Sequence, residues 1–568
     1  MPVENSRQAM RRSILIGWLP RAWRGSPTLA PFHAPIFAAI WTASLISNFG
    51  GLIQTVGASW LMTSIAPSAD MVALVQASTT LPIMLLSLAA GATADIWDRR
   101  VVMLIAQGLM LAVSATLSVT AYAGLITPWL LLSLTFLLGC GAALYGPAWQ
   151  SSVGEQVPRS DIAAAVALNS IAFNLARTAG PALGGLIVAL AGPPAAFLTN
   201  TISYVALIFV LATWRRPRPK SFLPAESMFM AMGAGVRYAR LSPGIRAVLV
   251  RGGVFGLIGS AVWALMPLIA RDLIKGGAVI YGLLLGAFGC GAVIGALRIT
   301  ALRRRHPNEL IHRCATLAFG AATLLTAMST IHLVSFAALM VAGAAWVLTL
   351  ATFNVTVQTS SPRWVVGRTV SLYQMITFGG LSLGSWIWGE ITTRFELRTS
   401  LLASGALMCL SILLGRRFRL LQPEGLNLDP SRTWSQEQNA QLQQLSESGP
   451  VVVTVEYRIA TENAEGFLHA MHELRRVRRR DGARRWSLMQ DMADEQRWVE
   501  RYHSPNWVEH LRRHHRFTVS DQEIERRAVA YHEGPEPPRV HHLIERQPSE
   551  SRPEPAAQTD ANLPSGPA

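Results

Sequence analysis

The stretch GATADIWDRR at residues 91–100 recurs as GALRITALRR at residues 295–304, a shift of 204 positions. The first two residues and the last two residues of the stretches are identical. The same shift pairs further marks along the chain: Pro158-Arg159 with Pro362-Arg363, Gly180 with Gly384, and Gly185 with Gly389. Long apolar runs fill the intervals in both copies. A duplication of this kind predicts two parallel repeats embedded in a membrane.

The composition also favours a membrane protein. Of the 568 residues, 51% are hydrophobic and only 15% are charged, whereas about a quarter of the residues of a soluble protein are charged. The formal charge is +16, and a basic chain can bind nucleic acid. Here the basic residues flank apolar runs. They therefore indicate contact with membrane lipids, and we expect no nucleic-acid partner.

Twelve stretches approach the roughly 20 apolar residues that a membrane-crossing helix needs. They lie at residues 37–62, 71–94, 101–123, 128–149, 162–190, 194–213, 245–270, 278–298, 311–330, 333–357, 366–391 and 399–415. Each of the first six precedes its partner in the second six by close to 204 residues. We therefore predict an all-α membrane protein with twelve transmembrane helices in two parallel six-helix bundles, residues 37–214 and 245–417.

The arginines indicate how the chain is oriented. They crowd the N-terminal tail (residues 1–36) and the connections that follow even-numbered spans, whereas the opposite side offers only Arg271, Lys275, Arg394 and Arg398. Because cytoplasmic loops carry the excess of basic residues, both termini are expected in the cytoplasm. The linker between the bundles, residues 215–244, contains an amphipathic piece near 225–240. That piece either lies at the membrane surface or serves only as a linker.

The connection between spans two and three has chemistry of its own. Gly91 allows two helices to approach closely. Asp98 is predicted to cap the N-terminus of span three, where a carboxylate meets the positive end of the helix dipole. Arg99 and Arg100 pair with carboxylates or anchor in anionic headgroups. An ordinary turn would explain one copy, but the second copy keeps three of these positions: Gly295, Arg303 and Arg304.

Span five contains a second motif, Gly180-Pro181-Ala-Leu-Gly184-Gly185. Pro181 cannot donate its backbone hydrogen bond and is predicted to kink the helix. The glycines leave a bare face against which another helix can pack. Such packing is common in membrane helices, so a purely structural role explains this motif equally well.

Together these motifs resemble those of the major facilitator superfamily, whose loop motif reads G-x-x-x-D-R-x-G-R-R. Four positions match: Gly91, Asp95, Arg99 and Arg100. Ile96 and Asp98 depart from the pattern. Ile299 stands where the second copy would carry the aspartate, so the carboxylate gate of this family is expected in one half only. The span-five motif looks like the antiporter motif of the family, and the chain is most similar to its transmembrane secretion effector branch.

This resemblance implies a secondary transporter of the bacterial cytoplasmic (inner) membrane. It implies that the protein exports siderophore-like or drug-like small molecules by alternating access, with a proton as the coupling ion. It implies neither enzymatic activity nor a cofactor. Two alternatives stay open: an importer, and a transporter-derived sensor whose cytosolic domain signals or catalyses.

Arg177 is the sharpest candidate for contact with the cargo. It lies about 15 residues into span five, roughly 22 Å deep at 1.5 Å per residue, where a cation is costly and normally faces a protein interior or cavity. It precedes Gly180 and Gly184 by three and seven residues, which predicts a shared helical face. We hypothesise that Arg177 faces the pathway between the halves and attracts anionic or oxygen-rich cargo. Alternatively, it bonds to Asn174 or to carbonyls freed by Pro181.

Further polar and aromatic residues within the spans are expected to line the same pathway. These candidates are Asn48, Gln54, Trp149, Asn174, Tyr373 and Gln374. Each could equally serve as a hydrogen-bonding contact between helices. No Asp or Glu stands near the middle of any span. The nearest candidate for a coupling residue is Asp95, at the end of span two.

The chain changes character after the last span. Residues 418–450 form a polar linker, and residues 451–535 alternate as strand 451–459, helix 463–480, strands 483–492 and 497–503, and helix 505–516. This order is typical of a ferredoxin-like α+β domain. It resembles dimeric α+β barrel domains, which implies a possible homodimer. Residues 536–568 are rich in Pro, Glu, Ser and Ala and are expected to be disordered.

Two histidines of this cytosolic domain are candidate ligands for a metal ion. His510 and His514 share a helical face and could bind one together. No third ligand stands at a suitable spacing, so we predict no metal site. A catalytic role does not follow from the fold.

Overall fold

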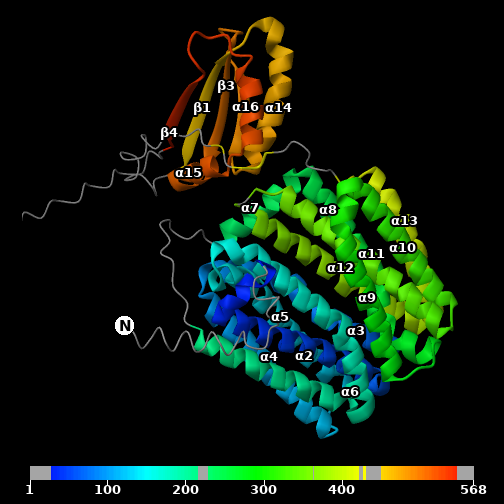
Figure 1. Ribbon diagram of the computed structural model, residues 1–568. Coiled ribbons are helices and arrows are strands. Elements are labelled where there is room, and N and C mark those ends of the chain that lie inside the picture. The colour runs from blue at the N-terminus through cyan, green and yellow to red at the C-terminus, as the bar shows by residue number, and fades with distance from the viewer. Residues whose placement is uncertain are drawn as a thin grey trace, which may run out of the picture. The chain divides into compact units, whose positions relative to one another are not determined.

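The computed structural model describes residues 27–214, 228–362, 364–420, 427–429, 431 and 450–545. It divides into two compact units, Met1–Gly425 and Leu426–Ala568. In Figure 1 the first unit runs from blue to yellow and consists of helices, and the second contains the strands.

The helices of the first unit match the predicted spans closely. They are α2 (Pro35–Ile65), α3 (Ala69–Ile96), α4 (Arg99–Tyr122), α5 (Pro128–Gln156), α6 (Ile162–Thr213), α7 (Met228–Leu241), α8 (Pro243–Leu268), α9 (Ala278–Arg305), α10 (Asn308–Met328), α11 (His332–Thr359), α12 (Val366–Phe395) and α13 (Leu397–Leu410). Within the described residues, ten stretches are long and apolar enough to cross a membrane. The predicted number of twelve stays a prediction.

The long helix α6 is interrupted at Gly192, whose backbone is non-helical (φ 78°, ψ 169°). Glycine adopts a positive φ without steric penalty, and Pro193 and Pro194, which follow, lack the N–H groups that would continue the helix. The interruption lies between the predicted spans 162–190 and 194–213. The 30-residue helix α12 is long enough to cross a membrane but is not among the ten apolar stretches.

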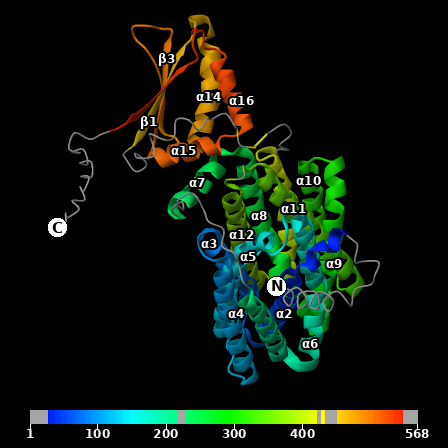
Figure 2. The ribbon, with the colours of Figure 1, turned by 60° about the vertical axis from the view of Figure 1, so that its left-hand side comes forward.

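Two helix pairs make the most extensive contacts between the repeats: α3 with α12, and α6 with α9. The 204-residue shift maps α3 onto α9 and the first segment of α6 onto α12, so the pairs are equivalent. Figures 1 and 2 show α2–α6 in blue to cyan and α8–α13 in green to yellow. We call this boundary between the repeats the seam.

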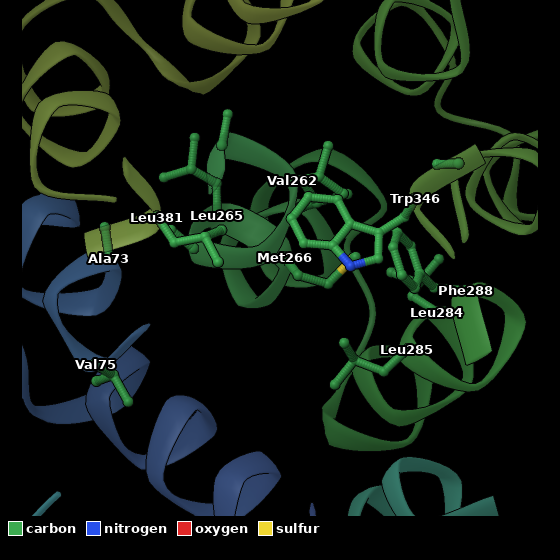
Figure 3. Packing of buried hydrophobic residues seen from close by; sticks show 14 of the residues in the cluster. Ala73, Val75, Val262, Leu265, Met266, Leu284, Leu285, Phe288, Trp346 and Leu381 are labelled. Atoms are coloured by element: carbon green, nitrogen blue, oxygen red, sulfur yellow. The ribbon is translucent and has the colours of Figure 1, made fainter. Parts of the chain in front are cut away.

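Aromatic residues fill the core of the second repeat. The ring centroids of Phe255 and Trp346 lie 5.1 Å apart, and those of Trp263 and Phe288 lie 4.7 Å apart. Figure 3 shows the Trp346 indole lying among Val262, Met266 and Phe288. Large rings contributed by α8, α9 and α11 hold these three helices together.

The second unit is an antiparallel sheet with helices. Its elements are β1 (Val451–Arg458), α14 (Ala464–Arg480), β2 (Arg484–Gln490), β3 (Arg497–Ser504), α15 (Trp507–Arg516), α16 (Val519–Val529) and β4 (Arg539–Ile544). The strand order is β2-β3-β1-β4, and all neighbours are antiparallel. Figures 1 and 2 show α14 and α16 side by side along the sheet. The strands and helices predicted between residues 451 and 516 all form.

Two boundaries of this unit differ from expectation. Strand β4 lies within residues 536–568, which we expected to be disordered, and it pairs with β1 (Val455 opposite Val540). The expectation of disorder followed the Pro-, Glu- and Ser-rich composition of the whole segment, whereas β4 itself contains Val540 and Ile544, which favour strands. Part of the linker 418–450 also packs on the unit, because Val519 donates its backbone N–H to Asp429. Residues 546–568 lie outside the described part.

Candidate functional site

Arg177 lies at the seam. It is the only charged residue of α6, and its guanidinium carbon stands 5.5 Å from the ring centroid of Trp263, which belongs to α8 of the other repeat. A cation over an indole face is attracted by the ring quadrupole. Among the described residues, no acidic side chain forms an ion pair with Arg177. The side chain is only partly buried.

Tight helix packing places Arg177 there. A Cβ atom at Gly289 of α9 would lie 2.7 Å from the backbone oxygen of Arg177 and 2.9 Å from the Cα of Thr178. The backbones of α6 and α9 therefore touch at this level. Asn174 donates its side-chain amide to the backbone oxygen of Ser170 at 2.8 Å, not to Arg177. The alternative that Asn174 holds Arg177 thus finds no support among the described contacts.

The antiporter-like motif contacts two different neighbours. A Cβ atom on Gly180 would lie 3.0 Å from Leu52 Cβ, and one on Gly184 would lie 3.0 Å from Ile53 Cα, so both face α2 of the same repeat. Gly185 faces the other repeat, with Gly282 Cα 2.9 Å from its Cβ position. Arg177, Gly180 and Gly184 keep the helical spacing of the predicted common face, but they contact different helices. The long arginine side chain reaches α8, whereas the glycines contact α2.

Three of the other pathway candidates serve packing within a repeat. Gln54 is buried, and its side-chain oxygen accepts hydrogen bonds from Ser114 at 2.7 Å and Asn200 at 2.6 Å. Trp149 packs on an apolar cluster of the first repeat. Tyr373 is buried 6.3 Å from Phe353. The depth of a side chain inside a bundle depends on helix rotation, which a single sequence does not reveal.

Asn48 and Gln374 are placed differently. Both are partly exposed, and neither forms a hydrogen bond with any described residue. They come from α2 of the first repeat and α12 of the second repeat. Asn48 and Gln374 therefore remain, with Arg177, the pathway candidates that retain unused polar groups.

The residues of the loop motif in the first repeat bind to the ends of neighbouring helices. Asp98 caps α4 by accepting the backbone N–H of Arg100 at 3.0 Å, which confirms the predicted cap. Arg99 forms an ion pair with Glu155 of α5 at 2.7 Å. Arg100 donates to the backbone oxygen of Leu211, at the end of α6, at 2.9 Å. The motif therefore ties the ends of α4, α5 and α6 together. The side chain of Asp95 lies outside the described part.

The second copy of the loop motif makes different contacts. Arg303 donates to the amide oxygen of Asn308 at 3.2 Å, and Arg304 is exposed. A Cβ atom at Gly295 would meet the backbone oxygen of Ala344 at 2.7 Å, whereas one at Gly91 would meet Ser371 of the opposite repeat at 3.2 Å. Of these two glycines, Gly91 faces the opposite repeat and Gly295 faces its own.

Sequence reasoning missed a buried ion pair in the second repeat. Arg251 of α8 binds Glu309 of α10 at 2.5 Å and donates to the backbone oxygen of Phe418 at 3.2 Å. Glu309 also accepts the backbone N–H of Leu420 at 3.0 Å. The sequence did carry a signal for this pair. Arg251 lies six residues into the predicted span 245–270, and Glu309 lies just before the predicted span 311–330. The first residues of the linker 418–450 are thus held against α8 and α10.

Comparisons with known proteins agree on a family of exporters. The profile of a family described as transmembrane secretion effector matches residues 26–550. The multidrug efflux pump Tap of Mycobacterium tuberculosis is 25% identical over 387 residues, which covers 65% of this chain and 90% of that protein. The enterobactin exporter EntS of Salmonella typhi is 28% identical over 347 residues, which covers 59% of this chain and 81% of that protein.

Solved structures share the fold. The nucleoside transporter NupG superposes with a TM-score of 0.57 at 12% identity, over 68% of this chain and 100% of that chain. A bacterial homologue of the lysosomal transporter Spinster gives a TM-score of 0.55 at 13% identity, over 68% and 97%. At such identities the likeness concerns the fold alone.

Proposed function

The chain belongs to the transmembrane secretion effector family of major facilitator transporters, and we propose that it exports small organic molecules, siderophore-like or drug-like, across the bacterial inner membrane by proton-coupled alternating access. The observation that carries this proposal is the position of Arg177 at the seam, over Trp263 of the opposite repeat. The relatives named as an efflux pump and a siderophore exporter support the direction of transport.

In this proposal the cargo meets Arg177 where the halves touch. A cation deep in a membrane protein is costly unless an anion or dipole compensates it. An anionic or oxygen-rich group of the cargo provides that compensation, and Asn48 and Gln374 supply hydrogen bonds from the two repeats. Alternating access then exposes this site to one side of the membrane at a time.

Twelve crossings with both termini in the cytoplasm fit this role. The ten apolar stretches become eleven when α6 is divided at Gly192, and α12 supplies the twelfth. Its polar residues suit a helix that faces a pathway rather than lipid.

The second unit is proposed to be a ferredoxin-like domain that regulates the transporter, dimerises, or recruits a biosynthetic partner. The strand order β2-β3-β1-β4 and the antiparallel pairing support this class. A rival function is a sensor in which the membrane part binds ligand and this unit signals. Deleting the residues after 420 separates the two functions. Export that survives favours the transporter, and ligand binding without flux favours the sensor.

The central test compares metabolites in medium and cytosol between a wild-type strain and a deletion strain, and then measures efflux of the cargo with Arg177→Ala and Arg177→Lys. We expect at least a tenfold loss with Arg177→Ala and partial activity with Arg177→Lys. Arg398→Ala, at an exposed arginine of α13, is the matched control. Unchanged efflux with Arg177→Ala at equal expression would refute a role for Arg177.

A further inference from the structure

The charges of the α+β unit are unevenly distributed. Residues 450–545 contain sixteen arginines and sixteen acidic residues, so their formal charges cancel. Between residues 475 and 485, however, seven arginines stand beside a single acidic residue, Asp481. This segment comprises the end of α14 and the beginning of β2.

Two of these seven arginines are held inside the unit. Arg478 is buried and pairs with Glu500 at 3.3 Å, and Arg480 pairs with Asp521 at 2.7 Å. The other five are exposed, and none of them forms an ion pair with a described carboxylate. They are Arg475, Arg476, Arg479, Arg484 and Arg485, and we call these five arginines the basic end.

The strand register places the basic end where β1 begins. Arg484 stands opposite His503, near the end of β3, and the end of β3 pairs with the beginning of β1, with Ser504 opposite Val451. Helix α14 ends at Arg480, four residues before Arg484. The five arginines therefore gather at one end of the sheet.

Acidic residues gather at the opposite end, where β1 ends and β3 begins. Arg458 and Arg497 stand opposite each other there. Arg497 pairs with a carboxylate in the turn before β3 at 3.2 Å, and Arg539, at the beginning of β4, pairs with a carboxylate just before it at 3.3 Å. The connections at this end contain the acidic residues Asp491, Asp494, Glu495, Glu533 and Glu536. The unit is thus positive at one end of its strands and negative at the other.

The chain from the membrane helices reaches this unit at its basic end. Val519, the first residue of α16, donates its backbone N–H to Asp429 of the linker at 3.0 Å, two residues before Asp521, the partner of Arg480. Leu420 is held against α10. Nine peptide steps separate Leu420 from Asp429 and span at most about 32 Å, whatever the orientation of the unit.

We propose that the basic end docks on the anionic phospholipid headgroups of the cytoplasmic leaflet. This inference rests on the proposed cytoplasmic position of the chain ends. Phospholipids of that leaflet give its surface a negative potential, and each arginine near such a surface strengthens binding roughly fivefold. The short tether keeps the leaflet within reach.

The membrane helices themselves are a poor partner for the basic end. The helix ends on the predicted cytoplasmic side carry exposed arginines of their own, among them Arg304, Arg305, Arg416 and Arg417. Because like charges repel, anionic lipid is the favourable neighbour within the reach of the tether.

The experiment uses the full chain in lipid nanodiscs made from phosphatidylcholine alone or with added phosphatidylglycerol. Phenylglyoxal modifies accessible arginine side chains, and mass spectrometry of peptides gives the rate at each arginine. We expect the basic end to react at least fivefold more slowly in discs with phosphatidylglycerol. Arg526 and Arg539, exposed and outside the basic end, should react equally in both discs. Salt at about 1 M shortens the Debye length to about 3 Å and should abolish the difference.

Two double variants remove the same number of charges from different places. Arg484→Gln with Arg485→Gln should remove most of the protection of the remaining three arginines. Arg526→Gln with Arg539→Gln should leave the protection of the basic end intact. Hydrogen exchange of β1 peptides checks that the unit is folded in both variants.

Two results would overturn lipid docking. Rates at the basic end that match between the two kinds of disc would refute it, whether these arginines react freely or are covered by protein. Protection that nuclease digestion abolishes would assign the basic end to a nucleic acid instead. The discs contain no cargo and offer both leaflets, so either result leaves the proposed export function standing.

Discussion

Gln54 illustrates how a polar residue is accommodated inside a membrane bundle. Its side-chain oxygen accepts hydrogen bonds from Ser114 of α4 and Asn200 of α6. Helices α2, α4 and α6 of the first repeat are thus linked through one acceptor. An unsatisfied donor buried inside a membrane bundle would cost on the order of several kcal/mol. Asn48, six residues earlier on α2, is partly exposed and makes no such bond with a described residue.

These two residues give a matched pair of variants. Gln54→Leu should destabilise the protein by about 1–2 kcal/mol, because the buried amide of Asn200 loses its acceptor and Ser114 loses one of its partners, and should leave the transport rate of the folded fraction unchanged. Asn48→Leu should leave the stability of the protein unchanged and should lower the transport rate of the folded fraction. Thermal denaturation in detergent and efflux per folded molecule measure the two effects. A stable Gln54→Leu protein that fails to export would instead place Gln54 in the pathway.

His510, in the α+β unit, is expected to make the stability of this unit depend on pH. Burial, together with the neighbouring Arg513, lowers the pKa of His510 to about 2. The unfolded chain binds a proton near the ordinary histidine pKa of about 6.5, so stability is lost as the pH falls below that value. The maximal slope from one group is about 1.4 kcal/mol per pH unit.

His510→Gln should therefore flatten the acid sensitivity of this unit. Urea titrations of the full chain at about pH 5 and pH 7, read by hydrogen exchange of β1 peptides, measure the difference between variant and wild type. An identical pH dependence in both proteins would show that His510 does not couple protonation to folding.

At the scale of elements, the repeat explains the two kinds of glycine in span five. Gly180 and its equivalent Gly384 pack within their own repeats, against α2 and α8. Gly185 and its equivalent Gly389 lie at the seam, against α9 and α3. Because the pattern recurs in both repeats, one set holds each bundle together and the other permits contact between bundles.

A substitution at the seam should therefore impair motion more than folding. In Gly185→Val the added Cβ would meet the backbone oxygen of Ala278 at 2.6 Å and Gly282 Cα at 2.9 Å, so α6 and α9 must separate. We expect efflux to fall at least tenfold, and Gly389→Val should behave alike. Gly51→Ala is the control, since nothing lies within 4 Å of its Cβ position. Normal efflux in Gly185→Val would show that this close contact is dispensable.

At the scale of the molecule, each of the two units contains apolar clusters of its own among the described residues. The membrane unit contains one large buried cluster, which includes Phe319. The α+β unit contains its own cluster, which includes Phe467. Separate cores unfold as separate cooperative units when few contacts cross between them.

Calorimetry of the full chain should show two transitions. Phe467→Ala should lower only one of them, because loss of a buried phenylalanine costs about 3–5 kcal/mol within its own core. Phe319→Ala should lower only the other. A single transition that both substitutions shift would indicate that the two units fold as one.

Much of this architecture follows from local patterns. The helices, the Asp98 cap and the strands β1–β3 of the second unit are set by residues near in sequence, through apolar length, helix capping and alternation. Strand β4 was missed because the polar, Pro-rich composition of residues 536–568 concealed a short strand, which pairs with β1 far away in sequence.

The sequence by itself determined that the protein is a duplicated membrane protein and that Arg177 lies deep within it, since both depend on composition and spacing. Only the tertiary structure decided what each polar side chain meets. Arg177 reaches Trp263 across the seam, whereas Gln54 accepts hydrogen bonds from residues of its own repeat. The difference is set by the rotation of each helix against its neighbours, and packing over the whole bundle fixes that rotation.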